Sequence, residues 1–422
     1  MDLHFDPLQY RYPSRRRLVY GRRGMVCASQ PLAAQAGLDM IKKGGNAFDA
    51  ALAAAACLAV VEPMSCNMGG DGFALIWHEG KLYGLNASGP APALLSVDTL
   101  KQAGYTEMPK YGWGAVTVPG VTSGWAEINK RFGKLSLSQI LEPAASYARD
   151  GFPVSPVVSA LWNRLAESFK KELSPEFYEA WAADFTIGGR APRAGEIFKY
   201  KGMAETLEEL GRTNCESFYR GAIADAIDSY SRKTGGYLRK EDLAAYKAQW
   251  VEPISVNYKG YDVFEMPPNG HGITALMALN MLKGLDLGDS RECADVYHKM
   301  IEATKLAFVD TKKFVADPRY MRTKVSDMLS ERYAAVRRAL ITDQAVYPEA
   351  GDPSCGGTVY FCVADGQGNM VSFIQSNYNR FGSGIVIPGT GITLQDRGAN
   401  FSLNPESDNY LQGGKKAYHT II

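Results

Sequence analysis

The hydrophobic pattern of residues 31–60 predicts two consecutive helices. The first is expected over Pro31–Lys43, because Gly44-Gly45 follows it as a C-terminal stop signal. Asn46 can then cap a second helix, which is rich in alanine across Ala50–Ala56. Small side chains allow close helix packing, so we interpret this second helix as a buried structural element.

A glycine-rich turn, Asn67–Gly72, separates the second helix from the apolar strand Phe73–Trp77. The turn lacks the G-x-G-x-x-G spacing and precedes a strand, so close backbone packing is favoured over phosphate binding. Residues 121–340 are expected to be mostly helical. An apolar helix is predicted over Ile273–Leu282, and another helix is predicted over residues 293–313.

Two segments rich in β-branched and aromatic residues, Thr358–Ala364 and Met370–Ser376, predict a β-hairpin. The turn signal Asp365–Asn369 lies between them. If Ala364 faces Met370, Thr358 faces Ser376 on the neighbouring strand. The hairpin therefore brings two hydroxyl side chains together at one end.

Composition excludes several classes of protein. The 422 residues carry 46 Lys+Arg against 45 Asp+Glu, without the basic excess of a dedicated nucleic-acid binder. No apolar run approaches the length of a transmembrane helix, and the arginine-rich start has no apolar core of a secretory signal. Seven scattered cysteines without C-x-x-C predict reduced thiols in a cytoplasmic protein. Five histidines show no metal-ligand spacing, so neither metal nor cofactor is expected.

Three candidate nucleophiles compete in this sequence. Gly120–Gly124 resembles a serine elbow, but Pro119-Gly120 and the lack of a preceding apolar strand favour a turn. No cysteine stands out as one half of a Cys–His pair. Thr358 follows Gly357 and begins a strand, so cleavage between these two residues would free an α-amine to serve as the base for its hydroxyl. By themselves, however, these residues more often form a plain loop.

The chain resembles the γ-glutamyltranspeptidase family of N-terminal-nucleophile hydrolases. Each matching stretch is modest, but all of them occur in order. They are Ala28–Ala51, Gly69–Phe73, Gly235-Gly236 with Asp242–Tyr246, Pro267-Pro268 with Gly272–Thr274, Glu302–Phe308, Ala316–Pro318, Thr358–Asn369, Phe381–Gly384 and Gly391-Ile392. The resemblance implies an α+β fold, a four-layer αββα sandwich. It also implies one domain over 1–422, made of a large-subunit segment 1–357 and a small-subunit segment 358–422.

By this resemblance, Thr358 aligns with the family's autocleavage nucleophile, and Ser376 aligns with the family's hydroxyl residue on the second strand. The arginine that grips the glutamyl carboxylate aligns with Ser88, and the acid that holds the glutamyl amine aligns with Asn400. Losing both should weaken γ-glutamyl recognition. Arg397 offers a guanidinium that could replace the family's arginine and hold a carboxylate through two parallel hydrogen bonds. Its alternative role is a surface salt bridge with Asp396 or another acid.

The remaining pocket positions are also carried over from the resemblance. Tyr378 aligns with a family asparagine, and His419 and Thr420 align with paired serines near the acyl carboxylate. The segment between Phe401 and Lys415 is shorter than the family's lid, which favours water over an acceptor peptide. The chain also ends before the family's oxyanion-hole glycines, so the resemblance implies a truncated small-subunit segment.

This pattern is most similar to the acylase-like and oxamate-amidohydrolase-like branch of the family. We therefore expect a self-processing amidohydrolase that releases a small carboxylate-bearing acyl group from a small-molecule amide. A γ-glutamyl hydrolase or transpeptidase acting on glutathione-like substrates is one alternative. An unprocessed, non-catalytic relative is the other. No nucleic-acid or membrane partner is expected, and the sequence is compatible with a monomer or a homodimer.

Overall fold

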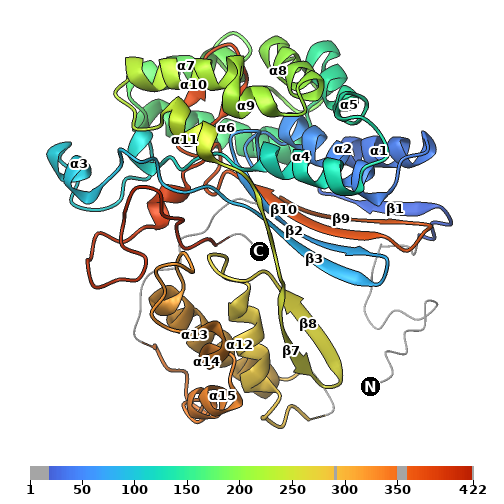
Figure 1. Ribbon diagram of the computed structural model, residues 1–422. Coiled ribbons are helices and arrows are strands. Elements are labelled where there is room, and N and C mark those ends of the chain that lie inside the picture. The colour runs from blue at the N-terminus through green and yellow to red at the C-terminus, as the bar shows by residue number, and fades with distance from the viewer. Residues whose placement is uncertain (1–18, 289–291, 349–358, 421–422) are drawn as a thin grey trace.

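A six-stranded antiparallel sheet with strand order β1-β9-β10-β2-β3-β6 forms the centre of the fold (Figure 1). The computed structural model describes residues 19–288, 292–348 and 359–420. The strands of the sheet are β1 (Gly24–Cys27), β2 (Asp71–His78), β3 (Lys81–Ala87), β6 (Gln249–Val251), β9 (Val359–Asp365) and β10 (Met370–Ser376). Strands that follow residue 358 thus lie between strands that precede it.

The predicted hairpin is confirmed over Val359–Ala364 and Met370–Gln375, whereas the predicted pairing of Thr358 with Ser376 lies outside the described residues. Met370 pairs with Ala364, and the pairing continues without a bulge to Gln375 and Val359. The strand β9 extends to Asp365, one residue beyond the prediction. The Asp365 carboxylate accepts hydrogen bonds from the backbone of the turn and, at 2.9 Å, from the Ala47 amide at the start of helix α2. The turn is therefore fastened to the helical layer.

The alanine-rich helix α2 (Ala47–Val61) is buried along its whole length, as the sequence predicted. Asn46 accepts hydrogen bonds from the amides of Phe48 and Asp49, and the Asp49 carboxylate accepts one from the Asn46 amide. This reciprocal cap satisfies amides that would otherwise be unpaired inside the protein. Helix α2 packs against β9 and β10, so the small side chains let it approach the sheet closely.

Further helices complete the layer on this face of the sheet (Figure 1). They are α1 (Pro31–Lys42), α4 (Val121–Phe132), α5 (Leu137–Asp150), α6 (Pro156–Glu172), α7 (Pro175–Phe185), α8 (Lys201–Arg212), α9 (Glu216–Arg220), α10 (Ala222–Lys233) and α11 (Lys240–Ala245). The turn predicted at Gly120–Gly124 is wrong, because α4 begins at Val121 with Gly120 as its N-cap. The side chains of Val121 and Trp125 are buried, and this packing provides the reason for a helix there.

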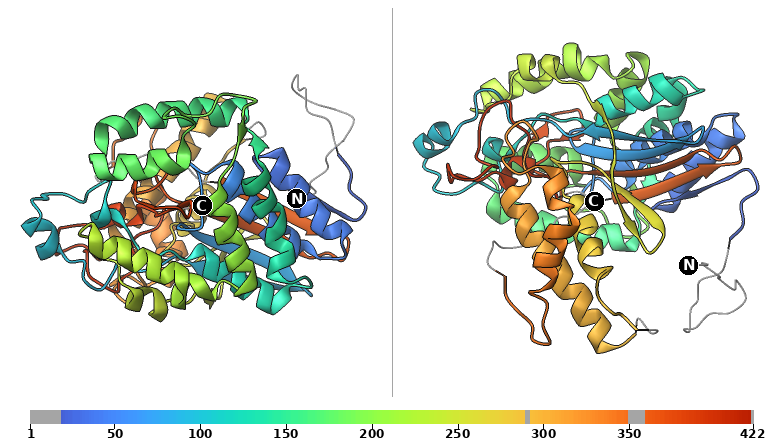
Figure 2. Two further views of the ribbon diagram at one scale, coloured as in Figure 1. Left: turned by 90° about the horizontal axis from the view of Figure 1, so that it is seen from above. Right: turned by 60° about the horizontal axis from the view of Figure 1, so that its bottom comes forward.

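A second β layer and its own helices lie against the opposite face of the sheet (Figure 2). The hairpin of β7 (Ile254–Tyr258) and β8 (Tyr261–Glu265) packs on α12 (Ile273–Leu282), which in turn packs on α13 (Ala294–Phe314) and α15 (Glu331–Arg338). Of these helices, α12 and α13 were predicted from the sequence. Helices, sheet, hairpin and helices follow one another, which confirms the α+β class and the layered architecture.

Short elements fill the remaining connections. They are α3 (Val97–Gln102), η1 (Trp113–Ala115), β4 (Phe152–Pro153), β5 (Ile197–Phe198), α14 (Val325–Met328), β11 (Val386–Ile387), β12 (Ile392–Thr393) and η2 (Arg397–Asn400). Isolated bridges join Gly69 to Leu394 and Gly270 to His419. Residues 391–420 therefore run back across the starts of β2 and α12.

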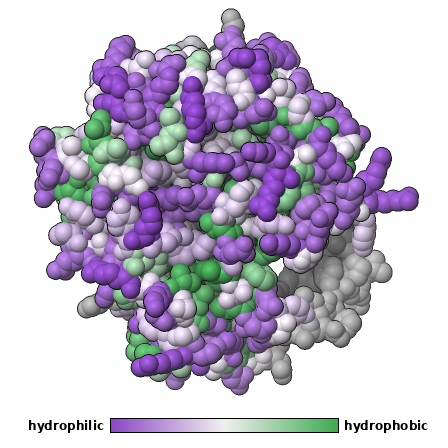
Figure 3. Space-filling view, viewed as in Figure 1, coloured by the Kyte–Doolittle hydropathy of each residue, from purple (hydrophilic) through white to green (hydrophobic). Residues whose placement is uncertain are grey.

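Hydrophilic side chains predominate over the upper helical layer on the face seen in Figure 3, and hydrophobic ones gather in its lower half. Exposed apolar side chains of the lower layer include Tyr297, Ile301 and Phe308 on α13. Within the described residues, no helix combines the length and apolar character that crossing a bilayer requires.

We expect Ala54→Leu to lower the free energy of unfolding by about 1–3 kcal/mol, because extra methyl groups in a closely packed core force neighbours apart. Ala54 has no exposed surface. Urea denaturation would measure the change. Ala160→Leu is the matched control, since Ala160 is exposed on helix α6 and its substitution should change stability by less than about 0.5 kcal/mol. Equal effects at the two positions would contradict the close packing of α2.

Candidate active site

Ser376, at the end of β10, pairs directly with Asp71 at the start of β2. Both residues are fully buried. The Ser376 hydroxyl accepts a hydrogen bond of 2.7 Å from the Tyr378 amide. Tyr378 has a positive φ of 76°, an uncommon conformation for a residue with a side chain, which is often found at functional sites. The predicted cleavage pair Gly357 and Thr358 lies outside the described residues.

A buried cluster of opposite charges surrounds this position. The Asp71 carboxylate accepts a hydrogen bond of 2.5 Å from His419 Nε2, and the same oxygen lies 3.7 Å from Arg397 Nε. None of the three side chains is more than 2% exposed. Burial, together with the nearby guanidinium of Arg397, lowers the pKa of His419 to about 4. His419 is therefore a neutral donor at pH 7, and Asp71 neutralises Arg397.

Arg397 brings two of the other predicted pocket residues together. Its Nη1 donates a hydrogen bond of 3.1 Å to the Thr420 hydroxyl, and its guanidinium lies 4.4 Å from the centre of the Tyr378 ring. The alternative of a surface salt bridge is wrong, because Arg397 is buried at the start of η2. Its Nε and the Asp71 Oδ1 have no hydrogen-bond partner among the described residues.

Asn400 and Ser88 lie at the edge of this cluster. The Asn400 amide donates a long hydrogen bond of 3.5 Å to the backbone carbonyl of Arg397. Ser88 is buried, and its hydroxyl accepts a hydrogen bond from Asn269, whose backbone carbonyl in turn accepts one from the His419 amide. Ser88 thus reaches the cluster through Asn269 rather than through a direct contact.

Asp71 is the main residue of this cluster that the sequence analysis did not single out. The surrounding glycines were interpreted as positions of close backbone packing, which is what they provide. A Cβ on Gly70 would lie 2.6 Å from the Ser376 carbonyl oxygen, and one on Gly69 would lie 2.1 Å from that of Thr393. An acidic residue in a glycine-rich turn before a buried strand was the available signal, because a buried carboxylate needs a partner.

A cavity of about 240 Å³ opens beside the cluster, between the sheet and the loop that leads into α12. Its walls include Phe73, Tyr360, Ile374 and Glu265. The ring of Phe73 lies 4.7 Å from that of His419, so the cavity adjoins the charged cluster. Burial raises the pKa of Glu265 to about 7.

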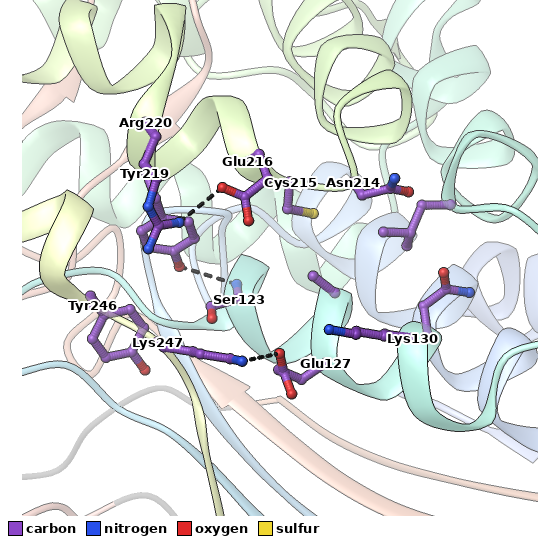
Figure 4. A pocket seen from close by; sticks show the side chains of 13 residues that line it. Ser123, Glu127, Lys130, Asn214, Cys215, Glu216, Tyr219, Arg220, Tyr246 and Lys247 are labelled. Atoms are coloured by element: carbon purple, nitrogen blue, oxygen red, sulfur yellow. Dashed lines mark hydrogen bonds and ion pairs between the residues drawn. The ribbon is translucent and has the colours of Figure 1, made fainter.

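A separate cavity in the helical layer surrounds Ser123, the serine of the rejected elbow (Figure 4). The Ser123 hydroxyl accepts a hydrogen bond of 2.9 Å from the Ala248 amide, and no histidine lines the cavity. Four of its charged side chains form two ion pairs, Lys247 with Glu127 and Arg220 with Glu216. The lining of this cavity therefore provides no histidine that could act as the base for Ser123.

Among the described residues, no three His, Cys, Asp or Glu side chains gather as they would around a metal ion. The layered antiparallel fold and the family match identify an N-terminal-nucleophile amide hydrolase. The chain belongs to the gamma-glutamyltranspeptidase family, whose model matches residues 33–422.

Known relatives agree with this assignment. The chain is 38% identical to the glutathione hydrolase-like YwrD proenzyme of Bacillus subtilis, over 96% of this chain and 76% of the relative. It is 34% identical to the oxamate amidohydrolase proenzyme of Klebsiella pneumoniae, over 94% of this chain and 75% of the relative. A cephalosporin acylase from Bacillus halodurans has a similar structure, with a TM-score of 0.93 and 52% identity over 99% of this chain and 77% of that one.

Proposed function

We propose that this protein is a self-processing amidohydrolase that releases a small carboxylate-bearing acyl group through an ester on Thr358. The observation that carries the proposal is the buried guanidinium of Arg397 beside Asp71, which pairs with Ser376 at the end of the central hairpin. The observed pairing of Val359 with Gln375 supports a position for Thr358 next to Ser376. Relatives named as proenzymes, among them an acylase and an amidohydrolase, support the class of reaction.

Self-processing would begin with attack of the Thr358 hydroxyl on the Gly357 carbonyl. The peptide nitrogen leaves as the α-amine of Thr358, and Gly357 becomes an ester on the threonine oxygen. Water then hydrolyses the ester, which frees the Gly357 carboxylate and the Thr358 hydroxyl. The two products are residues 1–357 and 358–422, and both contribute strands to one sheet.

Catalysis would use the same hydroxyl with the new α-amine as its base. The hydroxyl attacks the substrate amide, the amine product leaves with a proton, and water releases the acid from the acyl-enzyme. Ser376 would orient the nucleophile, and Arg397 would hold the acyl carboxylate with Tyr378, Asn400 and Thr420 around it. The cavity beside Phe73 provides space for the leaving amine.

A second function is favoured by the carboxylate of Asp71. Its Oδ1 lacks a partner among the described residues and its Oδ2 lies 3.7 Å from Arg397 Nε, so the pair of side chains suits a zwitterion. The α-ammonium of a γ-glutamyl group would face Asp71 and its α-carboxylate would face Arg397. The glutathione hydrolase proenzyme of Escherichia coli is 32% identical to this chain, which supports the same alternative.

The two functions are separated by p-nitroanilides that share one leaving group. We expect the glutaryl anilide to be hydrolysed with a kcat/KM at least about 10²-fold above that of the butyryl anilide, because the butyryl group has no carboxylate for the Arg397 guanidinium to hold. Released p-nitroaniline reports both rates.

The γ-glutamyl anilide, measured with and without glycylglycine, is the third substrate. A preference for it over the glutaryl anilide would favour the second function, and a rate that rises with glycylglycine would indicate a transpeptidase. Equal rates for the glutaryl and butyryl anilides would remove the role proposed for Arg397.

A further inference from the structure

Cys27 and Cys362 face each other across neighbouring strands of the central sheet. Cys27 ends the edge strand β1, and the register pairs it directly with Cys362 in β9. Directly opposite residues of antiparallel strands share one face, with Cα atoms about 4.5–5.5 Å apart. Disulfides in proteins span Cα distances of about 4.4–6.8 Å. The strand register therefore places the two Cα atoms within the range that a disulfide spans.

The environment of the pair favours thiol chemistry at Cys27. Cys27 is exposed and Cys362 is partly buried. Partial burial and the adjacent Cys27 thiol raise the pKa of the Cys362 thiol. By contrast, Cys57, Cys66 and Cys215 are fully buried, and burial raises the pKa of each well above its usual range. Buried thiols of this kind are inert.

We propose that Cys27 and Cys362 form a reversible dithiol–disulfide site that reacts with low-molecular-weight disulfides such as oxidised glutathione. The Cys27 thiolate attacks one sulfur of the small disulfide and releases one thiol, which leaves a mixed disulfide on Cys27. The Cys362 thiolate then attacks the Cys27 sulfur and releases the second thiol. The protein loses two hydrogens, and the small disulfide is reduced to two thiols.

The Cys27–Cys362 disulfide would also hold the two products of self-processing together, and this consequence rests on the proposed function. Cys27 precedes the cleavage position and Cys362 follows it, so the disulfide joins the two products covalently. It also ties the edge strand β1 to β9, whose first residue comes directly after Thr358. The oxidised protein could therefore neither lose its small segment nor open the sheet between these two strands.

The test uses the purified full chain incubated with oxidised glutathione and then blocked with N-ethylmaleimide. Peptide mapping by mass spectrometry should recover the Cys27 and Cys362 peptides joined and two hydrogens lighter than the separate peptides. Denaturing electrophoresis without reductant should show processed protein as one full-length species, which reductant separates into two. Cys27→Ser and Cys362→Ser should each abolish the joined species, and Cys293→Ser, at another exposed cysteine, should not.

Two readouts keep this proposal distinct from self-processing. In the unprocessed variant Thr358→Ala the joined peptides should still form, because the strand register does not depend on cleavage. Electrophoresis with reductant reports cleavage alone. Recovery of both thiols as maleimide adducts, or of a separate glutathione on each cysteine, would overturn the disulfide whatever the state of the Gly357–Thr358 bond.

Discussion

Replacing Thr358 by alanine is expected to leave one 422-residue chain without measurable amide hydrolysis, whereas the native protein is expected to separate into residues 1–357 and 358–422. Alanine has no hydroxyl to attack the Gly357 carbonyl, so the ester cannot form and the α-amine stays in a peptide bond. Loss of a nucleophile that also generates its own base should lower kcat/KM by at least about 10³-fold. Denaturing electrophoresis, N-terminal sequencing and anilide hydrolysis measure the two effects separately.

Two further variants make this result specific. Thr358→Ser keeps a hydroxyl and should retain both cleavage and turnover at reduced rates. Ser376→Ala should lower kcat by about 10²-fold, since it removes the hydroxyl that we propose orients the nucleophile. Intact native protein whose sequencing yields only the original N-terminus would identify an unprocessed relative. Normal turnover by Thr358→Ala would assign the nucleophile to another residue.

The central hairpin and the helix α2 were predictable because their signals are local. Alternation of apolar side chains and the turn Asp365–Asn369 determine the pairing of β9 with β10, and Asn46 determines where α2 begins. The placement of Ser376 next to the start of β9 follows from that pairing. Each of these predictions depends on residues that are close in the sequence.

The cluster around Asp71 could not be predicted in the same way. His419 bonds to Asp71 from 348 positions away in the sequence, and residues 391–420 reach this place by bridges to separate loops. Local residues also misled the prediction at Gly120. Its Pro-Gly signal indicates a turn, but burial of Trp125 in the tertiary core supports a helix. Long-range packing thus decided both features.

Replacing Asp71 by asparagine is expected to lower the free energy of unfolding by about 3–5 kcal/mol, because it leaves the buried guanidinium of Arg397 without a counter-charge. Asparagine preserves the shape of the side chain and an oxygen for His419, so the lost charge dominates the effect. Urea denaturation would measure it. Asp39→Asn is the matched control, since its ion pair with Lys42 at 2.9 Å is exposed and worth less than about 1 kcal/mol.

A second substitution at Arg397 separates the structural role of the pair from its proposed role in binding. The double variant Asp71→Asn with Arg397→Met should be more stable than Asp71→Asn alone, because no unpaired charge remains in the core. It should nevertheless fail to favour glutaryl over butyryl anilides, since the guanidinium that would hold the acyl carboxylate is gone.

If Asp71→Asn changes stability no more than Asp39→Asn, the charge of Asp71 does not stabilise Arg397. If the double variant regains no stability, the loss has another cause than the unpaired guanidinium. A double variant that keeps the glutaryl preference would show that the acyl group is recognised elsewhere.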